Sequence, residues 1–106
     1  MADDFYCDEA LSGRTQVEVI AETETVLAFR HTRPHWPVHV VVVPKLHVPS
    51  LLELDDGLAL ELLGVVRDVA ARISTDEGGC HIVTNLGKYQ ESKHLHFHVG
   101  AGEPMA

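Results

Sequence analysis

Alternating apolar and polar positions mark the first part of the chain as strand-forming. Apolar residues occupy every second position from Val17 to Ala21, which predicts a first strand there. A second strand is predicted from Thr25 to His31, and the acidic segment Glu22 to Glu24 between the two predicts a tight turn. Two prolines in the segment 33–37 remove backbone donors and fix φ, so this segment is predicted to be a loop.

An almost continuous run of valines follows, from Val38 to Val43. The run is interrupted only by His39 and ends at Pro44. A short apolar stretch of this kind is typical of a central strand that is covered on both faces. The histidine inside it is therefore conspicuous.

The pattern then changes to the helical period of three to four residues. One long helix is predicted over about residues 55–74, and Ser50 and Asp55 are both suited to cap an N-terminus. Its predicted core-facing positions are Leu58, Leu62, Val65, Val66, Val69 and Ile73.

After this helix the strand pattern returns. A fourth strand is predicted from Cys80 to Asn85, a loop over residues 86–93, and a last strand from His94 to Gly100. Strands joined by short loops, with one helix inserted late, predict an α+β fold with an antiparallel sheet of about five strands.

Composition narrows the class of protein. A chain of 106 residues predicts a single domain, which we place at residues 16–106 after a polar segment over residues 1–15 with a short helical turn at 8–11. The net charge of −8 argues against binding a nucleic-acid polymer. The sequence shows no signal-peptide pattern and no stretch long enough to span a membrane, so we expect a cytoplasmic protein.

The last predicted strand carries the candidate chemistry. In an extended chain His94, His96 and His98 would share one face, while Leu95 and the apolar residues after it would face the core. Three hypotheses follow: three separately satisfied polar residues; a metal site completed by another histidine; or covalent catalysis in which the middle imidazole attacks phosphorus. The third explains the spacing best.

The run from His94 to Val99 fits the H-φ-H-φ-H-φ signature of the histidine triad (HIT) family, where φ is an apolar residue, and the chain resembles this family over residues 16–102. The short chain is most similar to the phosphoramidase-like branch. Further points of similarity are the segment Val26 to Phe29, Pro34, His39 before the valine run, Pro44-Lys45, His47, Asn85, Leu86-Gly87 and Gln90.

The resemblance implies roles for individual residues. It makes His96 the nucleophile, with His94, His98 and His39 as orienting or phosphate-contacting neighbours. It also implies homodimers in which the sheets of two subunits join, and a small nucleotide-like substrate as the only other partner. The residues it implies for substrate binding are Asn85, Gln90, Phe29, Leu27, His31 and Ser92.

Two positions depart from the family pattern. His31 stands where the family commonly has an aspartate that accepts both ribose hydroxyls, and a single imidazole cannot do this. Glu91 stands where the family often has a hydroxyl beside the leaving group, so either Ser92 takes over or Lys93 meets a more anionic leaving group.

Taken together, these residues predict a nucleotide hydrolase or transferase acting at the α-phosphorus of nucleoside phosphoramidates or adenylated small molecules. The reaction would pass through a nucleotidyl-His96 intermediate, without metal or cofactor. The alternative is a HIT-like protein that binds nucleotide or phosphate, has lost efficient chemistry and serves a regulatory role. A metal-binding module is a third hypothesis.

Overall fold

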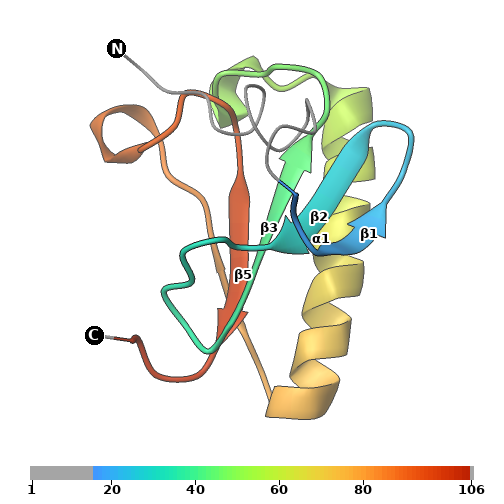
Figure 1. Ribbon diagram of the computed structural model, residues 1–106. Helices are drawn as coiled ribbons and strands as arrows, with labels where there is room; N and C mark the ends of the chain where they lie inside the picture. Colours follow the sequence, from blue (N-terminus) through green and yellow to red (C-terminus); the bar gives the residue numbers. More distant parts are fainter. Residues whose placement is uncertain (1–15, 106) are drawn as a thin grey trace.

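The computed structural model describes residues 16–105, which form one antiparallel sheet with a long helix on one face (Figure 1). The strands are β1 (Val19–Glu22), β2 (Val26–Arg30), β3 (Val38–Pro44), β4 (His81–Val83) and β5 (Phe97–Ala101), and the helix is α1 (Asp56–Glu77). Short 3-10 helices lie at Leu51–Glu53 and Gly87–Tyr89. The predicted α+β class with five strands and one long helix is confirmed.

The order of strands across the sheet is β1-β2-β3-β5-β4, and every neighbouring pair is antiparallel. This order puts β3 and β5 beside each other although about fifty residues of sequence separate them. His98 of β5 pairs with Val41 of β3, and Val99 pairs with Val40. The last strand is thus held in the middle of the sheet, between β3 and β4.

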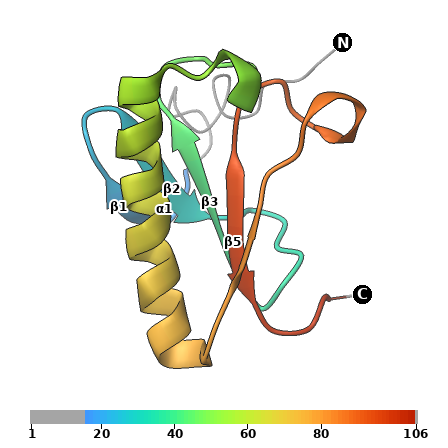
Figure 2. The ribbon, with the colours of Figure 1, turned by 180° about the vertical axis from the view of Figure 1, so that it is seen from behind.

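Alternation along the strands divides the sheet into two faces. Val40, Val42, Phe97 and Val99 belong to the main core, together with the buried face of α1. Seen from behind, α1 runs along this face of the sheet (Figure 2). The opposite face carries a second, smaller buried cluster formed by Leu27, Phe29, Val41 and Val43. On this opposite face the alternation also places His39 and His98.

The helix begins and ends where local chemistry dictates. The Asp55 carboxylate accepts hydrogen bonds from the backbone N–H groups of Gly57 and Leu58, as expected of an N-cap. The helix ends at Gly78, which takes the left-handed conformation with φ of 85°. Within residues 16–105 no helix is both long and apolar enough to cross a membrane.

Several predicted boundaries are wrong by a few residues. The fourth strand spans His81–Val83 rather than Cys80 to Asn85, and the last strand begins at Phe97 rather than at His94. Residues 94–96 leave the strand ladder because their groups bond elsewhere: the Leu95 N–H donates to Val48 O, and the His96 carbonyl accepts from Thr84. The helical turn predicted at residues 8–11 lies outside the described residues.

Candidate active site

A pocket of about 430 Å³ opens on the sheet face opposite α1. This volume is within the range of small-molecule sites. The pocket lies where the loop between β2 and β3 meets the ends of β4 and β5. Its lining residues are His31, Arg33, His35, Trp36, His39, Val83, Asn85, Glu91, His96 and His98.

His96 is buried and is oriented by the backbone of its own segment. Its Nδ1 lies 2.8 Å from the carbonyl oxygen of His94. A carbonyl oxygen only accepts, so Nδ1 of His96 carries a proton and donates it. In the neutral ring the lone pair is then on Nε2, which is the atom that a nucleophilic imidazole needs.

A chain of hydrogen bonds orders the neighbouring pair His39 and His98. The backbone N–H of His35 donates to Nδ1 of His39 at 2.8 Å, so the proton of a neutral His39 is on Nε2. This Nε2 lies 2.8 Å from Nδ1 of His98 and donates to it. His98 therefore carries its own proton on Nε2, and its ring stands 4.9 Å from the ring of His96 in an edge-on arrangement.

Burial keeps this pair neutral. Desolvation, with smaller contributions from neighbouring imidazoles, lowers the pKa of His39 to about 4 and the pKa of His98 to about 3. Both rings are therefore uncharged near pH 7. Neutral rings preserve the hydrogen bond from His39 Nε2 to His98 Nδ1. If His98 were protonated, its Nδ1 would carry a proton and would face the N–H of His39 donor to donor.

His94 occupies a different environment from the other two triad histidines. It is fully buried, its Nε2 donates to the carbonyl oxygen of Pro44 at 2.8 Å, and it is not among the described residues that line the pocket. The prediction that all three histidines share one strand face is therefore wrong. His94 lies in the irregular segment before β5 and contributes its carbonyl oxygen, not its ring, to the orientation of His96.

His31 and Arg33 line the pocket from the loop that follows β2. The backbone N–H of Arg33 donates to Nδ1 of His31 at 2.9 Å, and the His31 ring stacks on that of His39 with centroids 4.4 Å apart. Desolvation is the main cause that lowers the pKa of His31. His96 lowers it further, while Glu91 raises it in part. The neutral ring therefore carries its proton on Nε2.

Trp36 closes the end of the pocket nearest β4. Its ring stacks on His81 with centroids 5.6 Å apart and lies against Gly100 of β5. A Cβ atom at position 100 would come within 2.3 Å of the indole, so this approach requires glycine. His81 thus supports the pocket wall, although the sequence pattern gave it no role.

Three histidines offer nitrogen atoms close enough together to suggest a metal site. One ligand atom each from His31, His39 and His98 lies within 4.8 Å of the others. The hydrogen bonds oppose this use, because in both His31 and His39 a backbone N–H occupies the Nδ1 lone pair and the proton is on Nε2. A metal ion would have to displace those protons.

The structure brings half of the predicted site residues together in one pocket. His96, His98, His39, His31 and Asn85 line one pocket. Among the described residues the lining does not include Gln90, whose amide donates to the Pro49 carbonyl, or Ser92, whose hydroxyl accepts from the His94 N–H. Leu27 and Phe29 are buried in the smaller core cluster.

The structure also shows which of residues 91–93, just before the triad, reaches the pocket. Ser92 is buried, and Lys93 donates to the carbonyl oxygen of Gly87, so the pocket receives only Glu91 from these three residues. Sequence analysis assigned no role to Arg33 or His35. Their position in a loop next to His31 was the one available signal, because loop residues beside a site residue are frequently part of the site.

Fold and site together define a small α+β protein with a cluster of hydrogen-bonded imidazoles on one face of its sheet. The HIT domain family matches residues 12–105, and the protein belongs to this family. The resemblance noted in the sequence is thereby confirmed.

Known relatives cover nearly the whole chain. It is 36% identical over 104 residues to an uncharacterised 13.2 kDa HIT-like protein of Azospirillum brasilense, a match that covers 90% of this chain and 83% of the relative. It is 25% identical over 111 residues to the purine nucleoside phosphoramidase of Escherichia coli K12, covering 99% and 92%. The solved structure of a HIT family hydrolase from Clostridium thermocellum matches with a TM-score of 0.79 and 27% identity, covering 100% and 96%.

Proposed function

We propose that the protein is a hydrolase or nucleotidyl transferase that acts at the α-phosphorus of nucleoside phosphoramidates or adenylated small molecules. The observation that carries this proposal is the bond between Nδ1 of His96 and the His94 carbonyl oxygen, because it leaves the ring lone pair on Nε2 in a ligand-sized pocket. The similarity to a purine nucleoside phosphoramidase supports the substrate class.

The proposed reaction has two steps. Nε2 of His96 forms a bond to phosphorus while the bond from phosphorus to the leaving nitrogen breaks, and that nitrogen departs as an amine with a proton from solvent. Water then cleaves the nucleotidyl-His96 bond and releases the nucleoside monophosphate. The N–H of His98 at Nε2 would donate to an oxygen of the phosphoryl group, where negative charge accumulates in both steps. No metal or cofactor takes part in this scheme.

Trapping the intermediate would test this proposal directly. The protein would be mixed with adenosine 5′-phosphoramidate, quenched in base, in which phosphohistidine bonds survive, and analysed by mass spectrometry for a nucleotidyl adduct on His96. We expect His96→Ala to lose the adduct and all measurable turnover while it keeps the circular dichroism spectrum of the folded wild type. His47→Ala, which removes an exposed imidazole outside the pocket, is the matched control. Substantial turnover by His96→Ala would overturn the mechanism.

The second candidate function is binding of nucleotide or phosphate without efficient chemistry. Glu91 favours it, because an ionised carboxylate in the pocket wall has no proton to donate to the leaving group, whereas the hydroxyl often found at this position in the family has one. Tight binding of AMP or GMP, with no turnover of any phosphoramidate or adenylate in a panel, would support this candidate and exclude the first.

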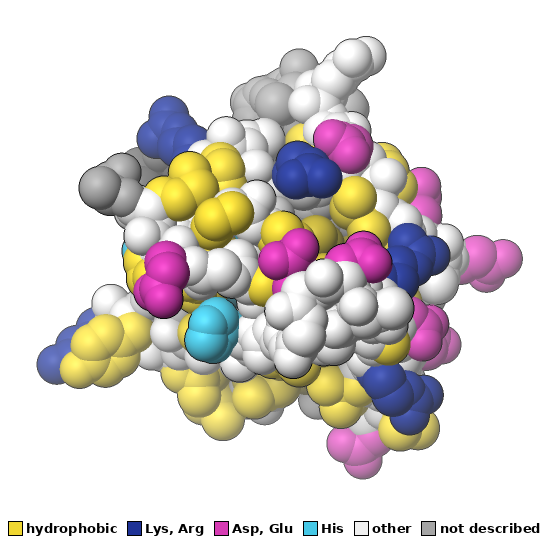
Figure 3. All heavy atoms as spheres, turned by 90° about the horizontal axis from the view of Figure 1, so that it is seen from below, with side chains coloured by type: hydrophobic (Ala, Val, Ile, Leu, Met, Phe, Trp, Pro, Cys, Tyr) yellow, Lys and Arg dark blue, Asp and Glu magenta, His cyan; other side chains and the backbone are white. Residues whose placement is uncertain are grey.

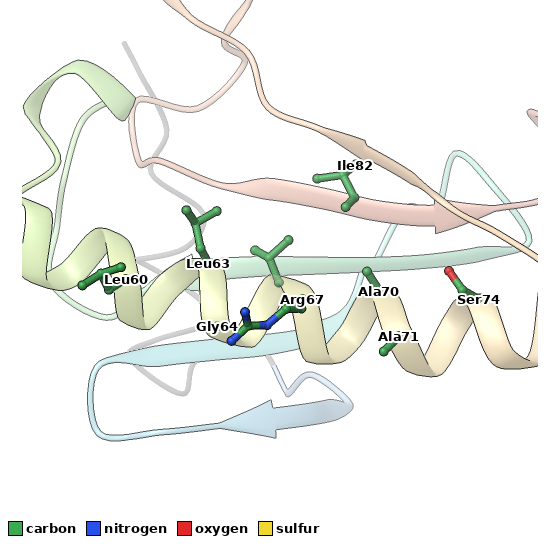
Figure 4. Close-up of a pocket in the computed structure, with 9 residues that line it drawn as sticks. Leu60, Leu63, Gly64, Arg67, Ala70, Ala71, Ser74 and Ile82 are labelled. Carbon is green, nitrogen blue, oxygen red and sulfur yellow. The ribbon is translucent and has the colours of Figure 1, made fainter.

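We also propose that the protein is a homodimer, joined through β4 and α1. β4 is a short edge strand, and beside it an apolar groove is lined by Leu60, Leu63 and Ile82, all exposed (Figure 4). Exposed apolar side chains also lie among charged ones across the face shown in Figure 3, so the unpaired edge strand beside the groove is what favours this surface. A second copy of β4 would extend the sheet and cover the groove.

Light scattering would test the dimer. We expect a mass of about two chains for the wild type and one chain for Ile82→Glu, because a charge in the groove opposes its burial. Leu52→Glu changes an exposed leucine outside the groove and should stay dimeric. A monomeric wild type would refute the shared sheet.

A cytoplasmic location stays a prediction of the sequence.

A further inference from the structure

The pocket wall contains two hydrogen-bond donors that the proposed reaction does not use. Nδ1 of His31 accepts the Arg33 backbone N–H, so His31 presents a donor at Nε2 and no ring acceptor. Its ring is half-buried and held by stacking on His39, with its centroid 5.8 Å from that of His98. His31 is thus a fixed donor within the same pocket as the nucleophile.

Arg33 adds the only permanent positive charge among the described residues that line this pocket. Within residues 16–105 the ion pairs join Arg30 with Glu18 and Lys45 with Glu22, and none engages Arg33. A guanidinium group presents paired N–H donors that match the oxygen atoms of a phosphate. Arg33 is therefore available to a ligand in a way that Arg30 is not.

The acidic character of the whole molecule makes the Arg33 cation in the pocket wall significant for the choice of ligand. The chain has a net charge of −8, which disfavours the approach of polyanions, and Glu91 adds a carboxylate to the wall. Charges beyond about 8 Å are largely screened at physiological salt, so the local potential depends on the charges inside the pocket, which are Arg33 and Glu91. A fixed imidazole donor and a guanidinium, two positions apart in one loop, suit an anionic group and do not suit a pair of donor hydroxyls.

We propose that His31 and Arg33 form a subsite for a second phosphate group, so that the preferred substrates are nucleoside 5′-phosphoryl compounds that carry a further phosphate on the sugar. This inference rests on the proposed function, since it names the substrates of the same pocket. The reacting phosphorus would meet His96 and His98, and the second phosphate would accept hydrogen bonds from His31 Nε2 and from the Arg33 guanidinium. The second phosphate is not cleaved.

Two matched substrates separate this proposal from the underlying function. Turnover of adenosine 5′-phosphoramidate would be compared with that of its 3′-phosphorylated and 2′-phosphorylated derivatives. We expect kcat/KM to be about 10- to 100-fold higher for a phosphorylated derivative, the size of a charged hydrogen bond. Turnover of all three at equal efficiency would overturn the subsite and leave the proposed function intact. No turnover and no adduct with any of them would overturn both.

Substitutions of Arg33 and His31 test whether these two residues cause the preference for a second phosphate. Arg33→Gln should reduce the ratio of kcat/KM for the phosphorylated over the unphosphorylated substrate about tenfold or more. Arg30 is an exposed arginine that pairs with Glu18 outside the pocket, so Arg30→Gln should keep the full preference for the phosphorylated substrate. His31→Asp replaces a donor with an acceptor and should reverse the preference, because a carboxylate repels phosphate and accepts ribose hydroxyls. An unchanged ratio in both Arg33→Gln and His31→Asp would refute the subsite.

Binding to the wild-type protein gives a readout that requires no variant. Adenosine 3′,5′-bisphosphate or adenosine 2′,5′-bisphosphate should bind about tenfold or more tightly than AMP, and the advantage should shrink as salt is raised. Equal affinities of AMP and both bisphosphates would contradict the proposal even if every variant failed to fold.

Discussion

Hydrogen bonds to backbone groups set the proton positions of the histidines in this site. The carbonyl of His94 takes the proton of His96 Nδ1, and the N–H of His35 fills the lone pair of His39 Nδ1. These two bonds fix opposite tautomers in two rings of the same pocket. In the proposed reaction the first ring is the nucleophile, and the second is a donor that orients His98.

Removal of the donor at His39 should therefore affect the rate more than binding. We expect His39→Ala to lower kcat about tenfold, the size of one lost hydrogen bond, with a KM close to that of the wild type. His39→Gln retains an amide N–H that can reach His98 and should recover part of the rate. Steady-state kinetics on a phosphoramidate would show this, and a change confined to KM would argue against a positioning role.

The sequence predicted the identity of the triad but not the separate environment of His94. Alternation in the sequence implied one strand face for all three rings. The side chain of His94 instead reaches Pro44, fifty residues earlier, and the neighbouring Leu95 N–H bonds to Val48. A bond between distant segments of the chain has no local signature, so the pattern of apolar positions alone could not reveal it.

At the level of elements, the loop after β2 and the strand β5 depend on each other. The indole of Trp36 lies where a side chain at position 100 would be, and Pro37 lies against Gly102 in the same way. The N–H of Met105 also donates to the carbonyl of His35. The pocket loop is therefore held by contacts with residues 100–105 as well as by its own hydrogen bonds.

Gly100→Ala should disturb this contact. The added methyl group would lie 2.3 Å from the indole and 2.8 Å from the Val38 carbonyl oxygen, so we expect a loss of about 1–3 kcal/mol in the free energy of unfolding. Gly57→Ala is the matched control: the atoms nearest its added methyl are the Asp55 carboxylate oxygens, at an ordinary 3.8 and 3.9 Å, so this variant should be at least as stable as the wild type. Urea titration measures both. Equal stability of the two variants would contradict the packing described.

The cap of α1 allows a second test at this scale. Asp55→Ala should cost about 1 kcal/mol of unfolding free energy, because the N–H groups of Gly57 and Leu58 lose their acceptor. Asp55→Asn keeps an acceptor oxygen and should cost much less. A similar loss in both variants would show that charge, and not capping, is the main effect.

Most of the elements could be predicted, because each has a regular apolar period and a chemical stop signal. Asp55 and the glycines after α1 are such signals, and the helix agrees with its prediction at the N-terminus within a residue. The two 3-10 helices and the start of β5 could not be predicted in this way. They depend on hydrogen bonds to other segments and have no apolar periodicity of their own. For the same reason the wall residues Arg33 and His35 were missed.

For the whole molecule, the low pKa values of the buried histidines link stability to pH. His39 and His98 have pKa values of about 4 and about 3 in the folded protein, against 6.5 for an unperturbed histidine. Between about pH 6.5 and pH 4 the unfolded chain binds protons that the folded protein does not. The free energy of unfolding should therefore fall as the pH is lowered through this window.

Urea titrations at intervals from pH 7 to pH 4 would measure this fall. A variant that combines His39→Gln and His98→Asn lacks both titrating rings, so its stability should depend less on pH over the same range. Identical slopes for the wild type and this variant would mean that the two histidines do not carry the effect. Carboxylate protonation adds its own contribution only toward the acidic end.

The position of Trp36 makes the pocket optically visible. It is the single tryptophan of the chain, and it lies in the pocket wall between the imidazole cluster and His81. Emission excited at the red edge of the absorption band, where tyrosine contributes little, therefore comes from this site alone. Occupation of the pocket, or protonation of a nearby ring, can be followed in real time in unlabelled, unmodified protein, and a stopped-flow instrument could separate ligand binding from the chemical step.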